Sequence, residues 1–376
     1  SVADAWISGD RRHSIDYALF PWKGRGMTIG ELIRLLSDGE FHSGQQLGEK
    51  LGVSRAAVWK QLRKLEDLGI PMEAVKGQGY RLAEPLELLD GPSVVAALSR
   101  ESRRHLSRLF VEDTLPSSNE FLRERFRQGA GHAEACLVEQ QSAGRGRRGR
   151  TWTTPWGRTL MCSVGWRFDS GVAALEGLSL AIGVVLAQVL ERHGLKPGLK
   201  WPNDVLLPLG PQGAAQQGLD EQAATGQGAG QQGFGKLAGI LVEMSGDAAG
   251  PCEVVLGMGI NVDLPESFRA KIDQPVACVH DQAPGLSRNV LAAELLDGLL
   301  GMLAGFEEQG FDAWRDAWNA RHAFAGWDIE IIRGEQRELA QAGDVDGSGN
   351  LWVRKGIDGE RQERLVGGEI SVRARP

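Results

Sequence analysis

The stretch S-A-G-R-G-R-R-G-R over residues 142–150 interleaves four arginines with three glycines. Glycine lets a backbone approach a ligand closely and adopt positive φ. Arginine offers a planar, permanently charged fork that suits phosphate and carboxylate oxygens. The stretch therefore predicts a loop that wraps an anion, either a small ligand or a nucleic-acid backbone. It lacks the Lys-Ser/Thr ending of a P-loop, and its position between two strand patterns argues against a disordered basic tail.

Three further short stretches carry polar groups beside apolar runs: K-W-P-N-D at 200–204, K-L-A-G-I-L-V-E at 236–243 and G-M-G-I-N at 257–261. Asn203 and Asp204 follow a proline and could bond a ribose, a base or a metal-bound phosphate, although an ordinary Asx turn is commoner. Lys236 directly precedes a buried strand. It could be a phosphate ligand, or a surface lysine whose aliphatic stem is buried while its charge stays in solvent. The glycines at 257–261 precede no helix pattern, which excludes a dinucleotide-binding turn.

Composition narrows the class of protein. A chain of 376 residues predicts two or three domains. The excess of 49 Asp and Glu over 42 Lys and Arg argues against wholesale coating of DNA or membrane. The sequence shows no long apolar run typical of a membrane span and no secretory signal. Four scattered cysteines lack metal-ligand spacing, so we expect reduced buried thiols, no protein metal site and a cytoplasmic location.

Residues 27–90 predict a winged helix-turn-helix: three helix patterns followed by a hairpin pattern, Met72–Val75 and Tyr80–Leu82. Ser43 with Gln46 forms a capping-box pattern. Residues 50–81 hold seven Lys or Arg and three Asp or Glu, a basic exception in an acidic chain. The basic third helix favours DNA binding, with a dimerisation or docking module as the alternative. The residues expected at DNA are Ser54, Arg55, Lys60, Arg63 and Lys76.

The remaining chain predicts a multidomain α+β protein. Residues 91–325 mix strand and helix patterns of an α/β catalytic domain, and residues 326–376 have the short strand patterns of a small β-barrel. Residues 208–235, rich in Gly, Gln and Ala, predict a flexible insertion that loops into solvent. Residues 1–26 are poorly patterned, and we interpret them as an extension or an upstream-start artefact.

Taken in order, the motifs resemble the biotin protein ligase family, in particular its bifunctional bacterial form that also represses the biotin operon. The matching stretches are G-R-G-R-R-G-R, K-W-P-N-D, K-L-A-G-I-L-V-E, G-x-G-I-N and a final G-G-E-I-S-x-R, behind a helix-turn-helix. The resemblance implies a catalytic domain similar to class II synthetases and lipoate ligases, and a C-terminal barrel similar to Src-homology-3 domains. It spans roughly residues 27–373, apart from the insertion.

The resemblance also implies roles for individual residues. Lys236 and Arg147 would be catalytic. Biotin would contact Ser117, Ser118, Asn119, Gln141, Gly144, Arg145, Arg147, Lys236 and Gly239. The nucleotide would contact Arg148, Arg150, Trp152, Asn203, Asp204, Asn261 and Arg373. Ser118 stands where the family usually has threonine, which keeps the hydroxyl and loses a methyl. Glu369 would pair with Lys200.

The family reaction implied by this resemblance has two steps. Biotin and ATP, with Mg²⁺, give biotinyl-5′-AMP and pyrophosphate, and a lysine of a biotin carboxyl carrier protein then receives biotin. The arginine loop would order over the ligand, and the occupied protein would form a homodimer on biotin operator DNA. Two alternatives stay open: a lipoate ligase on the same catalytic fold, which the spelling of the arginine loop disfavours, and a non-catalytic ligand-sensing transcription factor.

Overall fold

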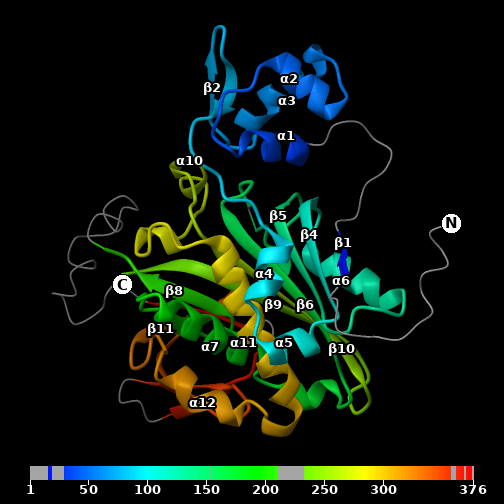
Figure 1. Ribbon diagram of the computed structural model, residues 1–376. Helices are drawn as coiled ribbons and strands as arrows, with labels where there is room; N and C mark the ends of the chain where they lie inside the picture. Colours follow the sequence, from blue (N-terminus) through cyan, green and yellow to red (C-terminus); the bar gives the residue numbers. More distant parts are fainter. Residues whose placement is uncertain are drawn as a thin grey trace, which may run out of the picture.

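The computed structural model describes residues 16–18, 29–152, 154–210, 233–356, 361–367 and 370–374. Three parts follow one another along the chain: a small helical part at the top of Figure 1, a large sheet with its helices, and a second small sheet at the bottom. This division agrees with the multidomain α+β organisation expected from the sequence.

The helical part contains α1 (Ile29–Leu36), α2 (Gly44–Leu51), α3 (Arg55–Asp67) and the hairpin β2 (Met72–Val75) and β3 (Gly79–Leu82). Ser43 and Gln46 form the expected capping box, and Gly52 ends α2 at φ 66°. Ser54 caps α3 by accepting a bond from the backbone N–H of Ala57. The predicted winged helix-turn-helix is therefore confirmed in its elements, with β3 beginning at Gly79, one residue earlier than predicted.

The central sheet has eight strands in the order β1-β4-β5-β6-β10-β9-β8-β7. β1–β4 and β4–β5 pair in parallel and the other neighbours pair antiparallel, so the sheet is mixed. Its strands are β1 (Asp16–Ala18), β4 (Arg108–Leu115), β5 (Glu134–Gln141), β6 (Thr159–Phe168), β7 (Gly198–Lys200), β8 (Asp204–Pro208), β9 (Phe234–Gly246) and β10 (Cys252–Asn261). β1 lies within residues 1–26, which the sequence left without a predicted element.

The two faces of this sheet are covered differently, because successive side chains of a strand point to opposite faces. Leu137, Leu160 and Val254 join the main core beneath four helices: α4 (Gly91–Ala97), α5 (Arg100–His105), α7 (Leu178–Arg192) and α11 (Arg288–Gln309). Their neighbours in sequence, Val138, Met161 and Val255, pack instead against the one helix α6 (Ser118–Arg127). In the described part of the chain, α6 is the helix that packs against β5, β6 and β10 on that second face.

Two helical stretches, Val172–Arg192 and Arg288–Gln309, are long and apolar enough to cross a membrane, which corrects the reading that the sequence has no such run. Within the 18-residue apolar segment of each stretch, 61% and 56% respectively are buried inside the protein. They are the central core helices on the covered face of the sheet, and burial against the strands explains their composition.

The C-terminal part is a five-stranded antiparallel sheet in the order β14-β13-β12-β11-β15. Its strands are β11 (Asp328–Arg333), β12 (Gln336–Val345), β13 (Leu351–Lys355), β14 (Arg361–Leu365) and β15 (Ile370–Ala374), preceded by the short helix α12 (Asp312–Asn319). Among the described strands, the outer two do not pair with each other, so the sheet is open at that seam. A closed barrel therefore stays a prediction.

The expected insertion at 208–235 is shorter than the sequence indicated. Pro208 pairs with Phe234 and Leu207 with Gly235, so both ends of the stretch belong to β8 and β9. Residues 211–232 lie outside the described residues. Lys236 stands on a paired strand, opposite Leu206 of β8, and the register of the two strands shifts directly after this pair.

A buried ion pair ties the segment after the hairpin to the central sheet. Arg288, at the start of α11, donates to Glu139 of β5 at 2.8 Å, with side chains 3% and 0% exposed. Glu139 also accepts the backbone N–H of Leu89 at 2.6 Å, and Arg288 donates to the carbonyl of Thr159 at 3.0 Å. Trp156, which follows the arginine loop, is buried in the hydrophobic cluster of the helix-turn-helix. The two parts thus share both a polar anchor and an apolar contact.

We expect Arg288→Met to lower the free energy of unfolding of the domain built on the central sheet by about 3–5 kcal/mol, because it leaves the Glu139 carboxylate buried without its cation. Urea unfolding followed by tryptophan fluorescence measures the change. The matched control is Arg192→Met, which breaks the ion pair between Arg192 and Glu294. Because these side chains are 55% and 31% exposed, we expect the free energy of unfolding to fall by less than about 1 kcal/mol. Equal effects of the two variants would contradict the prediction.

Candidate functional site

A cleft of about 520 Å³ opens on the face of the central sheet that α6 leaves uncovered. Six basic side chains line it among the described residues: Arg145, Arg147, Arg150, Lys200, Lys236 and Arg373. In the described ranges, Asp204 and Asp273 are the acidic side chains that line it. A cleft with this surplus of positive charge concentrates anions.

Glycines form part of the floor of the cleft. A Cβ at Gly259 would lie 2.6 Å from the Trp152 indole nitrogen, and one at Gly239 would lie 3.1 Å from the same ring. A Cβ at Gly257 would lie 2.2 Å from the side-chain oxygen of Asn119. The spacing of these glycines on β9 and β10 therefore makes room for the aromatic ring and for the first turn of α6.

A buried polar network connects the N-terminus of α6 with β5 and β6. Gln141 accepts bonds from the backbone N–H of Ser118 at 2.7 Å and from its hydroxyl at 3.0 Å. The hydroxyls of Ser118 and Ser163 lie 2.6 Å apart, and Ser163 donates to Asn119 at 2.7 Å. Asn119 in turn donates to Glu243 at 2.9 Å. The network holds these polar groups rigidly at one end of the cleft.

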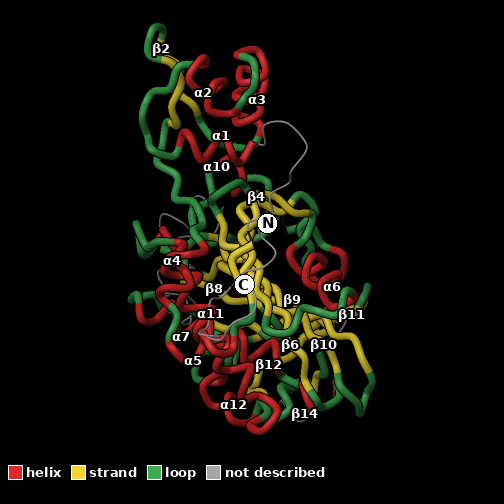
Figure 2. Tube along the Cα trace, turned by 45° about the vertical axis from the view of Figure 1, so that its right-hand side comes forward, coloured by secondary structure: helices red, strands yellow, loops and turns green. Residues whose placement is uncertain are grey.

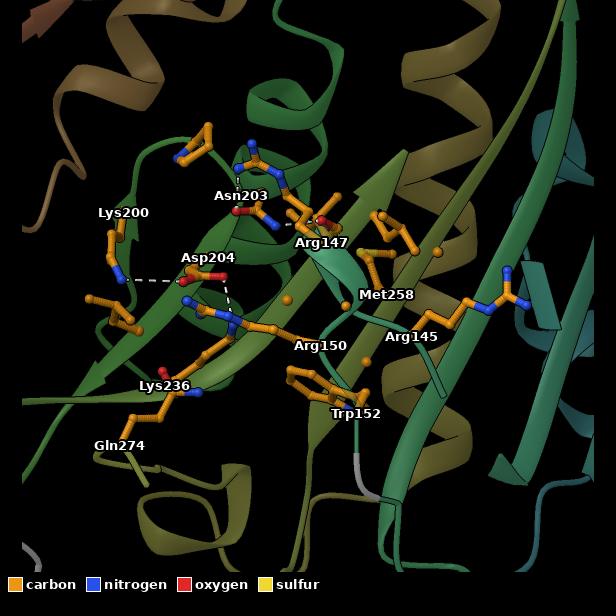
Figure 3. Close-up of a pocket in the computed structure, with 18 of the residues that line it drawn as sticks. Arg145, Arg147, Arg150, Trp152, Lys200, Asn203, Asp204, Lys236, Met258 and Gln274 are labelled. Carbon is orange, nitrogen blue, oxygen red and sulfur yellow. Dashed lines mark hydrogen bonds and ion pairs between the residues drawn. The ribbon is translucent and has the colours of Figure 1, made fainter. Parts of the chain in front are cut away.

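The arginine loop forms a compact turn closed by its own backbone. Gly146 donates to the carbonyl of Arg150 at 2.7 Å, and Trp152 donates to that of Gly144 at 2.9 Å. Within the turn, Arg147 donates to the side-chain oxygen of Asn203 at 3.1 Å. Figure 3 shows Arg147 directed to Asn203, whereas Arg145 points away from the other labelled cations.

Asp204 stands between two lysines at the other end of the cleft (Figure 3). Its carboxylate lies 2.8 Å from Lys236 and 3.4 Å from Lys200. Burial by itself would raise the pKa of Asp204, but the two ammonium groups outweigh it and lower that pKa below its ordinary value. Burial lowers the pKa of Lys200, and the charge of Asp204 opposes that change. Lys236 also lies over the Trp152 ring, 5.3 Å from its centroid.

Comparison with known proteins gives two family matches: a model described as the biotin/lipoate A/B protein ligase family over residues 111–261, and a helix-turn-helix domain over residues 31–81. The bifunctional ligase/repressor BirA of Salmonella typhimurium is 37% identical over 344 residues, which cover 91% of this chain and 97% of that protein. The Escherichia coli protein of the same name is 36% identical over 345 residues, 92% of this chain and 97% of its own. The chain belongs to the bifunctional ligase/repressor family.

A solved structure shares the fold of this ligase/repressor at lower identity. The biotin protein ligase from Aquifex aeolicus, in complex with biotin and ATP, aligns with a TM-score of 0.54 and 21% identity. The alignment covers 71% of this chain and 99% of that one. The likeness supports the biotin-ligase fold with its mixed sheet.

The cleft brings together most of the residues that the sequence singled out. Those that line it are Ser117, Ser118, Asn119, Gln141, Arg145, Arg147, Arg150, Trp152, Asn203, Asp204, Lys236, Gly239 and Arg373. Gly144 and Asn261 do not appear among the lining residues. Asn261 instead donates to the backbone carbonyl of Lys236 at 3.1 Å and so fixes the strand that carries the lysine. The side chain of Arg148, and Glu369 with its expected pairing, lie outside the described residues.

Sequence reasoning predicted no role for Ser163, Glu243, Gly257 and Gly259 of the ligase/repressor site, although the last three lie in the quoted motifs at 236–243 and 257–261. Ser163 had a usable signal, because a serine inside the apolar run Leu160–Trp166 is expected to have a buried partner. Glu243, at the end of a predicted strand, pairs with α6 residues that lie more than 100 positions away in the chain. That contact exists only after the sheet has formed.

In the helix-turn-helix, all five predicted DNA residues are exposed: Ser54, Arg55, Lys60, Arg63 and Lys76. Ser54 uses its hydroxyl to cap α3. Its structural role therefore lies in starting the helix that presents the basic residues.

We expect inorganic pyrophosphate to raise the melting temperature of the protein, because an anion that binds only the folded cleft stabilises it. Lys200→Met should weaken pyrophosphate binding roughly tenfold, the effect of one lost charge-assisted hydrogen bond. Lys196→Met, which removes an exposed lysine outside the cleft lining, is the matched control. Thermal unfolding over a pyrophosphate titration at constant ionic strength tests this. A shift that Lys200→Met leaves unchanged would show that the anion binds elsewhere.

Proposed function

We propose that this protein is a biotin ligase that activates biotin with ATP and transfers it to a carrier-protein lysine, and that it also represses biotin-synthesis genes. The observation that supports the ligase function is a single cleft with two kinds of lining. It has a neutral polar network at Ser118 and Gln141 and a cationic cluster at Lys236 and Arg147. Uncharged hydrogen-bonding groups suit the ring system of biotin. The cations suit its carboxylate and the phosphates of ATP.

The first step joins two anions, so charge neutralisation is its main requirement. A carboxylate oxygen of biotin attacks the α-phosphorus of ATP, the bond to the bridging β-phosphate oxygen breaks, and pyrophosphate leaves with the bond's electrons. Lys236 and Arg147 screen the repulsion between the reactants and stabilise negative charge as it develops on the phosphate. The proposal needs no covalent nucleophile on the enzyme.

The neighbours of these two cations hold them in place. Asp204 pairs with Lys236, and Asn261 fixes the backbone of the same lysine. Asn203 accepts from Arg147, and its amide donates to the carbonyl of Ile240 at 2.7 Å. Positioning of this kind reduces the reorganisation that the reaction requires. Asn203 and Asp204 thereby support the nucleotide site through the cations.

Mg²⁺ would enter with the nucleotide. The described residues contain no group of three or more side chains that could hold a metal ion by themselves. Asp204 and Asp273 are the acidic residues at the described cleft, which fits an ion bound mainly by phosphate oxygens and water. When bound, Mg²⁺ would neutralise part of the triphosphate charge.

The second step transfers biotin to the carrier. The lysine amine of a biotin carboxyl carrier protein attacks the carbonyl carbon of the mixed anhydride, its C–O bond to phosphate breaks, and AMP leaves while the amine loses a proton. Before transfer the anhydride must be kept from water. The turn that contains Arg147 and Trp152 lines the cleft, and in this proposal it covers the bound anhydride. All substrates of both steps are cytoplasmic, where we expect the protein to act.

Replacing Lys236 with alanine should slow biotin-dependent release of pyrophosphate from ATP by at least about 10²-fold, because a preorganised charge is lost at the reacting phosphate. The assay follows pyrophosphate release and the transfer of labelled biotin to a carrier domain. Lys196→Ala is the control and should keep full activity. Near-normal pyrophosphate release by the Lys236 variant would contradict the assignment, and faster adenylate formation with lipoate than with biotin would favour the lipoate-ligase alternative.

The repressor role rests on the helix-turn-helix with its exposed basic helix α3 and basic hairpin tip. Biotinyl-5′-AMP in the cleft would favour a homodimer, and two copies of α3 would then face a two-fold symmetric biotin operator. The apolar and polar ties between this domain and the catalytic sheet, at Trp156 and Glu139, give a rigid base for such an arrangement.

Protection of DNA upstream of biotin-synthesis genes should therefore require biotin and ATP together. DNase footprinting with the full chain measures this, and Arg63→Ala should weaken protection while leaving pyrophosphate release unchanged. Protection that is the same without biotin and ATP, or absent in every condition, would remove the biotin-dependent repressor role and leave the ligase intact.

A further inference from the structure

Trp59 is the feature of the helix-turn-helix that neither its fold nor its charge explains. It lies on α3 with 51% of its surface exposed, among the largest exposures of any bulky apolar side chain in the described chain. The inward face of the same helix already has its own apolar residues, Val58, Leu62 and Leu65. Trp59 therefore contributes little to the domain core, and an exposed aromatic ring of this size indicates contact with a partner.

The surroundings of Trp59 are basic. Arg55, Trp59 and Arg63 follow one another at four-residue spacing and so share a face of α3. The Arg63 guanidinium lies 5.0 Å from the centre of the Trp59 ring, which orients both groups together. Arg55 and Trp59 also line a shallow hollow that extends toward Tyr80 of the hairpin. The ring is thus the apolar member of a surface whose other members suit phosphates and base edges.

We propose that Trp59 is a specificity-determining residue that contacts a thymine C5-methyl group in the major groove. The proposal rests on the DNA-binding role given above. Among the base edges of the major groove, the thymine methyl is the apolar group, and apolar side chains on recognition helices contact it. Phosphate contacts fix position without reading sequence. The uncharged ring face of Trp59 is suited instead to the apolar groups of bases and sugars.

The geometry favours DNA over a protein partner for this ring. The basic residues Arg55, Lys60 and Arg63 surround it, and a polyanion is the partner that such charge attracts. Both views place α3 and its hairpin at the end of the molecule remote from the C-terminal sheet (Figures 1 and 2), where a DNA duplex has access. A contact to another protein would require that partner to be acidic around an apolar pocket.

The test uses the full chain with biotin and ATP, and a duplex selected by the wild-type protein from a random DNA pool. Each thymine of the selected site is replaced in turn by deoxyuridine, which removes only the C5-methyl. At one position per half-site, wild-type binding should weaken roughly five- to tenfold. Trp59→Ala should bind the unmodified duplex as weakly as wild type binds the deoxyuridine duplex. The affinity of Trp59→Ala should not fall further when deoxyuridine replaces that thymine. Trp59→Phe should recover part of the difference.

Salt dependence separates this contact from the electrostatic ones. Trp59→Ala should leave the slope of log affinity against log salt unchanged, whereas Lys76→Ala should reduce it by about one. Trp352→Ala, at a tryptophan 40% exposed on the C-terminal sheet, is the matched control and should leave DNA binding and biotin transfer unchanged. Biotin transfer by Trp59→Ala should equal that of wild type, and its far-ultraviolet circular dichroism should match wild type, which together show that both domains are folded.

Three results would overturn the inference. Wild-type affinity could stay the same when any thymine is replaced by deoxyuridine. Alternatively, the same replacement could weaken binding by Trp59→Ala as much as it weakens binding by wild type. Alternatively, Trp59→Ala could keep full DNA affinity and change only self-association by sedimentation, which would assign the ring to a protein contact. A wild-type protein that selects no DNA sequence contradicts the repressor role itself, and that result is obtained before any variant is made.

Discussion

Repulsion among cations in one cleft is the constraint on which the site depends. Arg147, Arg150, Lys200, Lys236 and Arg373 converge on a space that must stay open for an anionic substrate. Asp204 relieves part of that repulsion by pairing with two lysines at once, and its own pKa falls as a result. Because one carboxylate is shared between two ammonium groups, the cleft keeps a net positive charge. The remaining charge is what an incoming carboxylate and triphosphate can neutralise.

The cleft is possible because the two faces of the central sheet are covered by different elements. One face packs against α7 and α11 and supplies most of the apolar core. The other carries α6 at one end and glycines where the cleft opens, at Gly239, Gly257 and Gly259. A larger residue at these positions would displace Trp152 or Asn119. Stability and ligand access therefore come from opposite faces of the same strands, which lets the floor of the site remain rigid.

Positive charge is concentrated in two places, the helix-turn-helix and the cleft, which are also the two functional regions of the chain. The protein is acidic as a whole, yet its helix-turn-helix is locally basic and its cleft is lined by cations. The arginine-rich loop at 144–150 lies at the cleft, while the exposed basic side chains of α3 lie on a separate domain. Trp156 connects the two regions, since it follows that loop directly and packs in the core of the helix-turn-helix.

The sequence by itself determined the local elements and the chemistry of the site. Capping residues such as Ser43 and Ser54 and the spacing of apolar residues define α2 and α3, because these signals act within a few positions. The motif order was enough to indicate the ligase family and to name Lys236, Arg147 and Gln141. Only the tertiary structure decided which groups meet across long separations: Asp204 with Lys236, Glu243 with Asn119, and Arg288 with Glu139. It also decided that Asn261 holds a backbone and that the ends of the insertion are strands, since strand register and sheet face are set by pairing partners distant in the chain.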